Sequence, residues 1–69
     1  MTTPILLKFG TNMRQRRKSL GITLQMLADM TSLDRTHLNL IELGQRNTTL
    51  QTASKIAAAL EVSVKDLLS

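Results

Sequence analysis

The sequence contains no cysteine, and this absence limits how a chain of its length can be stabilised. With 69 residues there is room for one domain, near the lower limit for a single hydrophobic core that has no cross-link to stabilise it. Without cysteine, neither a disulfide nor a thiolate metal site can provide such a cross-link. We therefore expect residues 1–69 to form a single domain stabilised by close helix packing or by association of copies. The absence of cysteine also agrees with the cytoplasmic location that we expect.

Aromatic residues are almost absent as well, because Phe9 is the only one. Proteins that bind single-stranded nucleic acid commonly stack its bases on exposed aromatic side chains, so the composition argues against that mode. No apolar run approaches the roughly 20 residues that cross a membrane. The first ten residues, MTTPILLKFG, place no basic region ahead of a long apolar segment, so a signal peptide is not expected.

Acidic residues are outnumbered, with 5 Asp and Glu against 9 Lys and Arg and a net charge of +4. Four of the basic residues cluster within five positions: Arg14, Arg16, Arg17 and Lys18. A solvated helix face is the ordinary explanation of such a run. An excess of basic residues is also the electrostatic footprint of a polyanionic partner. Composition alone leaves both explanations open.

Turn-forming and cap-forming residues divide the chain into five segments with helical periodicity and no strand pattern. We expect helices over about residues 4–20, 24–30, 35–43, 50–60 and 64–68. The residues expected to cap their N-termini are Thr3, Thr23, Asp34, Thr49 and Ser63. Glycines at positions 21 and 44 are expected to end the first and third helices. The predicted fold is all-α, a compact five-helix domain.

Apolar residues recur at helical spacing along each segment and predict which side faces the core. In the fourth segment Leu50, Ala53, Ile56, Ala57 and Leu60 form one stripe. The inward residues expected in the earlier segments are Leu6, Phe9, Met13, Leu20, Leu24, Leu27, Ala28, Leu33, Leu38 and Ile41. Leu67 and Leu68 either end a core helix or are exposed at a dimer seam.

The second and third helices, with the short link between them, form a candidate helix-turn-helix over about residues 23–43. In such a unit the N-terminal residues of the second helix meet base edges in the major groove of DNA. Arg35 can donate two hydrogen bonds to guanine, and Thr36 offers a hydroxyl group and a methyl group. Asn39 can bind adenine or a phosphate, and His37 can donate to a phosphate. Arg46 and Asn47, in the following loop, are placed for backbone contacts.

From Met13 to Leu68 the chain resembles the Xre/Cro/phage-repressor helix-turn-helix family, which implies a lambda-repressor-like fold and DNA binding. The motifs that carry the resemblance are Arg14…Arg17…Gly21-Ile22-Thr23, Leu27-Ala28, Leu38…Ile41-Glu42…Gly44 and Ile56-Ala57…Ala59-Leu60…Val62-Ser63. More narrowly, the chain resembles the controller proteins of bacterial restriction–modification systems. That likeness is carried by Leu33-Asp34-Arg35-Thr36, Ile41-Glu42 and Arg46-Asn47. Controllers are small homodimeric regulators that bind palindromic operators.

Three positions depart from the family pattern. Many controllers have tyrosine where this chain has His37. Family members often place a phosphate-binding glutamine at the first position of the second helix, where Leu24 stands here, so Gln25 either takes over that contact or the contact is lost. Leu40 stands where some phage repressors use a polar base-reading residue, and it either touches thymine methyl groups or simply packs.

The resemblance also implies that Glu42 pairs with Arg17, which ties the first helix to the third. Glu42 has no second carboxylate at a useful spacing, and no catalytic set is visible, so an enzyme is not expected. His37 is the only histidine and has no cluster of ligands beside it, so neither a metal nor another cofactor is expected. Arg14, Arg16 and Lys18 are expected to be solvated, with at most one or two of them reaching phosphates.

The sequence therefore predicts a dimeric, sequence-specific regulator that binds double-stranded DNA and blocks or recruits RNA polymerase. Two-fold pairing doubles the short stretch that one reading helix can recognise. An antitoxin or a phage-type repressor would use the same domain. A protein-interaction module without DNA binding and a cationic amphipathic membrane binder are alternatives of other classes, and the well-placed helix caps argue against the last.

Overall fold

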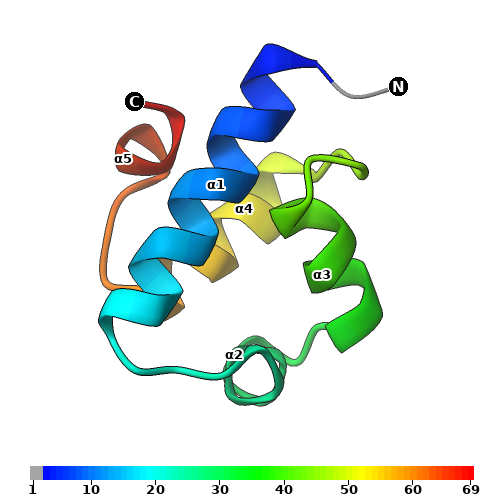
Figure 1. Ribbon diagram of the computed structural model, residues 1–69. Helices are drawn as coiled ribbons and strands as arrows, with labels where there is room; N and C mark the ends of the chain where they lie inside the picture. Colours follow the sequence, from blue (N-terminus) through cyan, green and yellow to red (C-terminus); the bar gives the residue numbers. More distant parts are fainter. Residues whose placement is uncertain (1–2) are drawn as a thin grey trace.

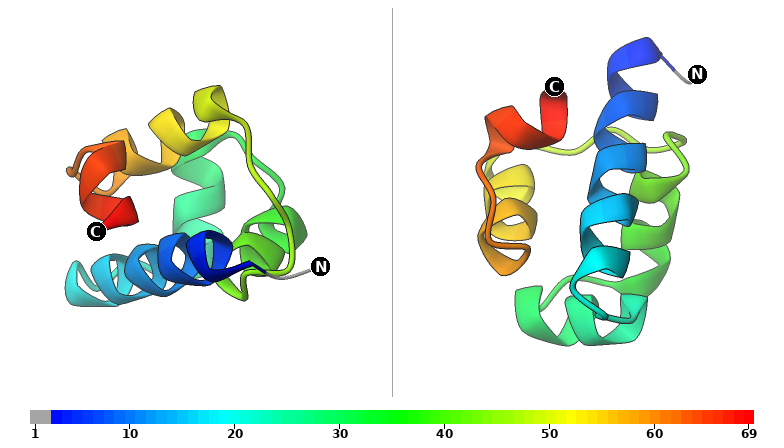
Figure 2. Two further views of the ribbon diagram at one scale, coloured as in Figure 1. Left: turned by 90° about the horizontal axis from the view of Figure 1, so that it is seen from above. Right: turned by 60° about the vertical axis from the view of Figure 1, so that its left-hand side comes forward.

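The computed structural model describes residues 3–69 and contains five helices, with no strand in that range (Figure 1). The helices are α1 (Pro4–Ser19), α2 (Leu24–Thr31), α3 (Arg35–Glu42), α4 (Leu50–Ala59) and α5 (Val64–Leu68). The expected all-α, five-helix architecture is confirmed. The long helix α1 contacts both α3 and α5, while α2 packs against α3 and α4 (Figures 1 and 2). The helix-turn-helix pair α2 and α3 thus forms one end and one side of the domain.

All five predicted N-caps are present, and each uses a side-chain oxygen to accept a backbone N–H that the first helical turn leaves unpaired. The hydroxyl of Thr23 accepts from Met26, and the carboxylate of Asp34 accepts from His37. Ser63 forms a reciprocal capping box with Asp66 at the start of α5. Short-range hydrogen bonding therefore determines where these helices begin.

The helix ends agree with prediction to within one residue. α1 ends at Ser19, and α2 continues through Thr31, whose buried hydroxyl donates to the Leu27 carbonyl at 2.8 Å. Gly21 and Gly44 follow α1 and α3 with φ angles of 70° and 71°. These angles lie in the left-handed region, which glycine adopts without a Cβ penalty.

The core consists of aliphatic side chains from all five helices around the single aromatic residue. Most of the predicted inward residues belong to it or pack against it. The buried members are Phe9, Met13, Leu27, Ala28, Leu38, Ile41, Ala53, Ile56, Ala57, Leu60 and Leu67.

One predicted core residue was placed wrongly. Leu50 is 76% exposed, although it shares the periodicity of the buried residues Ala53 and Ile56. It is the first residue of α4. Periodicity identifies the inward side of a helix but not how far the core extends along its axis, so the first turn projects beyond the core. Leu67 is buried at 2% exposure and belongs to the core, whereas Leu68 is 41% exposed, and its place at a dimer seam stays a prediction.

The prediction that the Arg16 side chain is solvated was also wrong. It is half-buried, and its Nε donates to the Leu60 carbonyl at 2.9 Å. That carbonyl lies at the C-terminal end of α4, where helices have acceptors without intrahelical partners. Asn12 makes a similar contact one turn earlier on α1, donating to the Leu67 carbonyl at 3.0 Å. Polar side chains of α1 therefore hold the α4–α5 segment in place.

Gly10 lies where α1 crosses α3. A Cβ built at this position would lie 2.5 Å from the carbonyl oxygen of Glu42 and as close to that of Ile41. Only hydrogen fits between the two backbones, so Gly10 allows α1 to approach α3 closely.

Candidate nucleic-acid interface

Helix α3 has one face in the core and another in solvent. Leu38, Ile41 and Glu42 are buried. Arg35, Thr36 and Asn39 are exposed, as the sequence predicts. Since 3.6 residues make one turn, this spacing separates the buried face from the exposed one. The exposed side chains are therefore free to contact another molecule while the helix stays anchored.

The N-terminal end of α3 combines a capping carboxylate with a neighbouring cationic side chain. Asp34 is the cap, and its Oδ2 accepts the backbone N–H of His37 at 3.0 Å. No acidic residue lies in the first turn itself. Arg35 adds a positive charge there, next to the partial positive charge of the helix dipole. His37 is half-buried.

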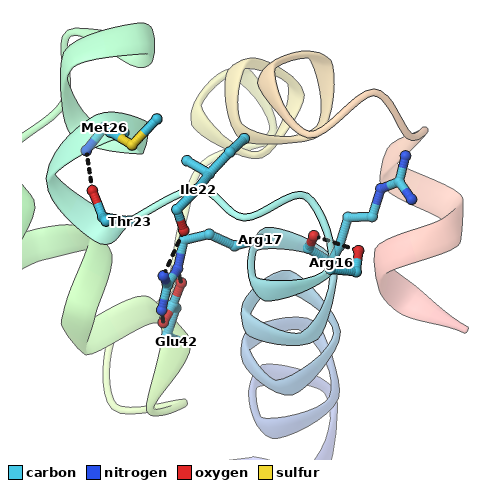
Figure 3. A network of polar contacts seen from close by, with 7 residues as sticks. Arg16, Arg17, Ile22, Thr23, Met26 and Glu42 are labelled. Carbon is cyan, nitrogen blue, oxygen red and sulfur yellow. Dashed lines mark hydrogen bonds and ion pairs between the residues drawn. The ribbon is translucent and has the colours of Figure 1, made fainter.

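A buried ion pair anchors the same helix from inside (Figure 3). The Nε of Arg17 lies 2.7 Å from Oε2 of Glu42, and its Nη2 lies 3.1 Å from Oε1. The side chains are only 12% and 4% exposed. This bidentate contact matches the planar geometry of the guanidinium and carboxylate groups. The structure thus contains the ion pair between α1 and α3 that the resemblance implies.

Arg17 has a third partner, because its Nη1 donates to the carbonyl of Ile22 at 2.9 Å (Figure 3). Ile22 lies in the link between α1 and α2, immediately before the cap residue Thr23. One guanidinium group therefore connects α1, the start of α2 and the end of α3. This arrangement fixes the orientation of α3 relative to the helix that supports it.

Gln25 is exposed on the first turn of α2, but its amide is already engaged. Its Nε2 donates to Oδ1 of Asp29 at 3.0 Å, one turn further along the helix. A phosphate contact from this amide would therefore compete with the carboxylate of Asp29. The sequence predicts the position of Gln25 but not this competing hydrogen bond.

Arg46 and Asn47 are exposed in the loop between α3 and α4. The side-chain Oδ1 of Asn47 accepts the backbone N–H of Thr48 at 2.8 Å. The amide NH₂ of Asn47 remains a donor, which suits a phosphate oxygen. Leu40 is half-buried on α3.

The range of residues 3–69 holds no group of three or more His, Cys, Asp or Glu side chains that could bind a metal ion. Within it, every helix is too short or too polar to reach across a lipid bilayer.

Helix α3 is short and capped, with one side buried and the other exposed, and the preceding helix supports it. These features define a helix-turn-helix domain. The chain belongs to the Helix-turn-helix family, whose model matches residues 13–67. The resemblance drawn from the sequence is thereby confirmed.

Individual proteins and solved structures of this family are similar to the chain over most of its length. The chain is 44% identical to Control protein C.BamHI of Bacillus amyloliquefaciens over 69 residues, covering 99% of this chain and 85% of that protein. The crystal structure of the restriction-modification controller protein C.AhdI from Aeromonas hydrophila has a TM-score of 0.86 and 37% identity. That match covers 90% of this chain and 94% of that one. SinR, a master regulator for biofilm formation crystallised in complex with DNA, has a TM-score of 0.84 and 34% identity, covering 88% of this chain and 98% of that one.

Proposed function

We propose that this protein is a sequence-specific, DNA-binding transcriptional regulator of the restriction–modification controller type. The observation that carries the proposal is the exposed face of α3, where Arg35, Thr36 and Asn39 project from a helix anchored by a buried ion pair. The names of the relatives, two of them controllers and one crystallised with DNA, support the same function. Residues 1–69 act as one DNA-binding domain.

The proposed binding mode places α3 in the major groove, which admits a single helix. Arg35 donates to guanine O6 and N7, Thr36 contacts a base or a thymine methyl group, and Asn39 bonds adenine. These contacts select the sequence.

A second set of residues positions the protein on the sugar–phosphate backbone without reading bases. It consists of His37, Gln25, Arg46 and Asn47. Gln25 must exchange its bond to Asp29 for the phosphate. The net charge of +4 supplies the general attraction to DNA, so binding is expected to weaken steeply with salt.

Two copies bind one palindromic operator, because a single eight-residue reading helix covers few base pairs. The half-sites then lie about 34 Å apart, one turn of B-DNA. Bound near a promoter in the cytoplasm, the dimer regulates by occupancy, either blocking or recruiting RNA polymerase. No catalytic step is part of this mechanism.

The test is selection of bound duplexes from a random pool, followed by sequencing. We expect an enriched palindromic motif that contains guanine, with affinity that falls as salt rises. A matched selection with a variant carrying both Arg35→Ala and Thr36→Ala should lose the motif. Recovery of no motif, together with the absence of any salt-dependent affinity for duplex DNA, would contradict the proposal and favour a protein-interaction module.

A further inference from the structure

A hollow on the surface lies where α1 passes the C-terminal end of α3, its neighbour in Figures 1 and 2. Helix α1 contributes Leu7, Arg14 and Lys18, whose spacing places them along one side of the helix. Glu42, the last residue of α3, and Leu43, directly after it, form the opposite side. We call this surface the α1–α3 hollow. The remaining residues that line it are Thr11 and Gln15.

One end of the hollow is apolar and open to solvent. Leu7 is 49% exposed and Leu43 is 44% exposed. They belong to distant segments that meet here, because a Cβ built at Gly44 would lie 3.0 Å from Cδ2 of Leu7. Single leucines on a surface are ordinary, whereas exposed apolar side chains gathered at one place mark a contact site.

The other end of the hollow is cationic. Arg14 and Lys18 are exposed and lie one turn apart on α1. Within residues 3–69 the ion pair joins Arg17 to Glu42, so neither Arg14 nor Lys18 has a carboxylate partner in that part of the chain. The same pair neutralises Glu42, the acidic residue in the lining. The α1–α3 hollow therefore combines an apolar end with a net positive end.

We propose that the α1–α3 hollow is a docking site for an acidic amphipathic helix of another protein. Leu7 and Arg14 are separated on α1 by two turns, a rise of about 10 Å. A partner helix that lies along α1 therefore needs apolar residues near one end and Asp or Glu about two turns away. Grooves commonly recognise helices through anchors spaced in this way.

A second copy of this chain does not offer such a helix. The chain has five acidic residues, and no helix within residues 3–69 contains more than one of them. Glu42 on α3 is buried in the ion pair, and Asp66 on α5 is engaged in the capping box. Two copies that each carry a charge of +4 also repel one another. The charge pattern thus points to a different protein as the occupant.

Duplex DNA is the other polyanion to consider. Phosphates would pair with Arg14 and Lys18 but would leave both exposed leucines in water, so the lining as a whole favours a protein. The hollow also lies at the opposite end of α3 from Arg35, about 12 Å along the helix axis. In the proposed binding mode the start of α3 contacts bases, so the hollow stays open on the operator. A partner docked there is carried to the promoter, which corresponds to recruitment rather than blocking. Only this simultaneous binding rests on the proposed function.

The experiment begins with selection of displayed random peptides of about 15 residues, long enough to form a helix, on the full-length parent protein. Excess duplex DNA is present, so that peptides bound to the proposed DNA-binding face are displaced. The most enriched peptide is synthesised with a fluorescent label. Its dissociation constant for the parent and each variant is then measured by fluorescence anisotropy at physiological ionic strength.

The apolar end is tested with Leu43→Ser. Its matched control is Met30→Ser, because Met30 is 53% exposed on α2 and lies outside the hollow. Both variants replace one exposed apolar side chain with a small polar one. We expect Leu43→Ser to raise the dissociation constant of the peptide by roughly fivefold or more, because the partner no longer covers a leucine. Its affinity for duplex DNA should equal that of the parent.

The cationic end is tested with the double variant Arg14→Glu/Lys18→Glu. Its matched control, Lys55→Glu/Lys65→Glu, changes the net charge equally at exposed positions on α4 and α5. The test variant should raise the dissociation constant by roughly tenfold or more, and the control by less than about twofold, because distant charges are screened. Circular dichroism checks folding, and Arg14→Gln/Lys18→Gln takes the place of the charge reversal if that variant unfolds.

The enriched peptides should combine Leu, Ile or Phe with Asp or Glu about two turns away. Enrichment of peptides without acidic residues overturns the inference, and so does peptide binding that persists in the folded Leu43→Ser and Arg14→Glu/Lys18→Glu proteins. If the charge reversal weakens duplex DNA binding and spares the peptide, the cations serve phosphates and the inference is again overturned. A parent protein that binds no duplex DNA, but whose peptide affinity is lost only in the hollow variants, supports the inference while refuting the proposed function.

Discussion

Replacement of Glu42 by alanine is expected to destabilise the fold by about 3 kcal/mol, because it leaves the buried Arg17 guanidinium without its carboxylate partner. Arg17 is 12% exposed and keeps one hydrogen bond, to the Ile22 carbonyl. That residual bond and partial hydration place the loss toward the lower end of the 3–5 kcal/mol that is typical when one partner of a buried pair is removed.

The expected loss is large relative to the whole stability of such a domain. At about 0.05–0.15 kcal/mol per residue, a chain of this length has roughly 3–10 kcal/mol in total. In domains of this size each kcal/mol corresponds to about 4–8 °C, so the melting temperature should fall by roughly 12–24 °C. The base preference of the remaining folded protein should be unchanged, because Glu42 faces the interior.

The assay is urea denaturation followed by circular dichroism, with Glu42→Gln, Arg17→Met and the double variant Arg17→Met/Glu42→Leu alongside. The double variant removes both charges and should recover part of the lost stability. Equal urea midpoints for Glu42→Ala and the parent would refute the structural role. A stable Glu42→Ala protein with an altered operator motif would show instead that Glu42 acts at the DNA.

Four further predictions concern other residues. Arg35→Ala should cost roughly 1–3 kcal/mol of operator affinity and relax preference at one base position, as measured by titration of single-base operator variants. Arg46→Ala should weaken binding to all sequences alike and flatten the plot of log affinity against log salt by about one unit. Gly10→Ala should lower the melting temperature by roughly 4–24 °C, the effect of overpacking by about 1–3 kcal/mol, because its methyl group meets the backbone of α3. The hydrogen bond from the Ser63 backbone lowers the pKa of Asp66 from its ordinary value of 3.8. The stabilisation of the fold by ionised Asp66 is therefore complete above that value and is lost as pH falls below it. The urea midpoints of the parent protein and Asp66→Asn should converge in that acidic range.

The helix boundaries were predictable because they depend on nearby residues. Thr23 and Asp34 each bond a backbone N–H three residues ahead, and Gly21 ends α1 through its own φ angle. Such signals act within one turn, so a single sequence contains them completely.

Other features depend on how distant segments meet, and the sequence does not contain them in readable form. Leu50 continues an apolar stripe, yet the neighbours that would bury it do not extend that far. Arg16 belongs to a basic run, but its partner is a carbonyl 44 residues away. Gly10 has no turn to form, and only the crossing of α1 and α3 explains it.

The candidate site was predictable in part for the same reasons. The buried spacing of Leu38 and Ile41 determines which residues of α3 face outward, so the exposure of Arg35 followed from periodicity. The hydrogen bond from Gln25 to Asp29 was not anticipated, because two polar groups one turn apart can bond to each other or to separate partners. The assignment of each outward side chain to a base or a phosphate stays a prediction.

In the proposed binding mode, helix α3 separates stability from recognition within eight residues, so the predictions for Glu42 and Arg35 are informative together. Glu42 lies at its C-terminal end in the interior, and Arg35 lies at its N-terminal end in solvent. If α3 is the reading helix, Glu42→Ala lowers stability and spares the motif, while Arg35→Ala spares stability and changes the motif. A helix that merely packs would show the first effect without the second. A helix that reads DNA without depending on the Arg17 contact would show the changed motif without the loss of stability. Only the two effects together require an anchored helix that reads bases.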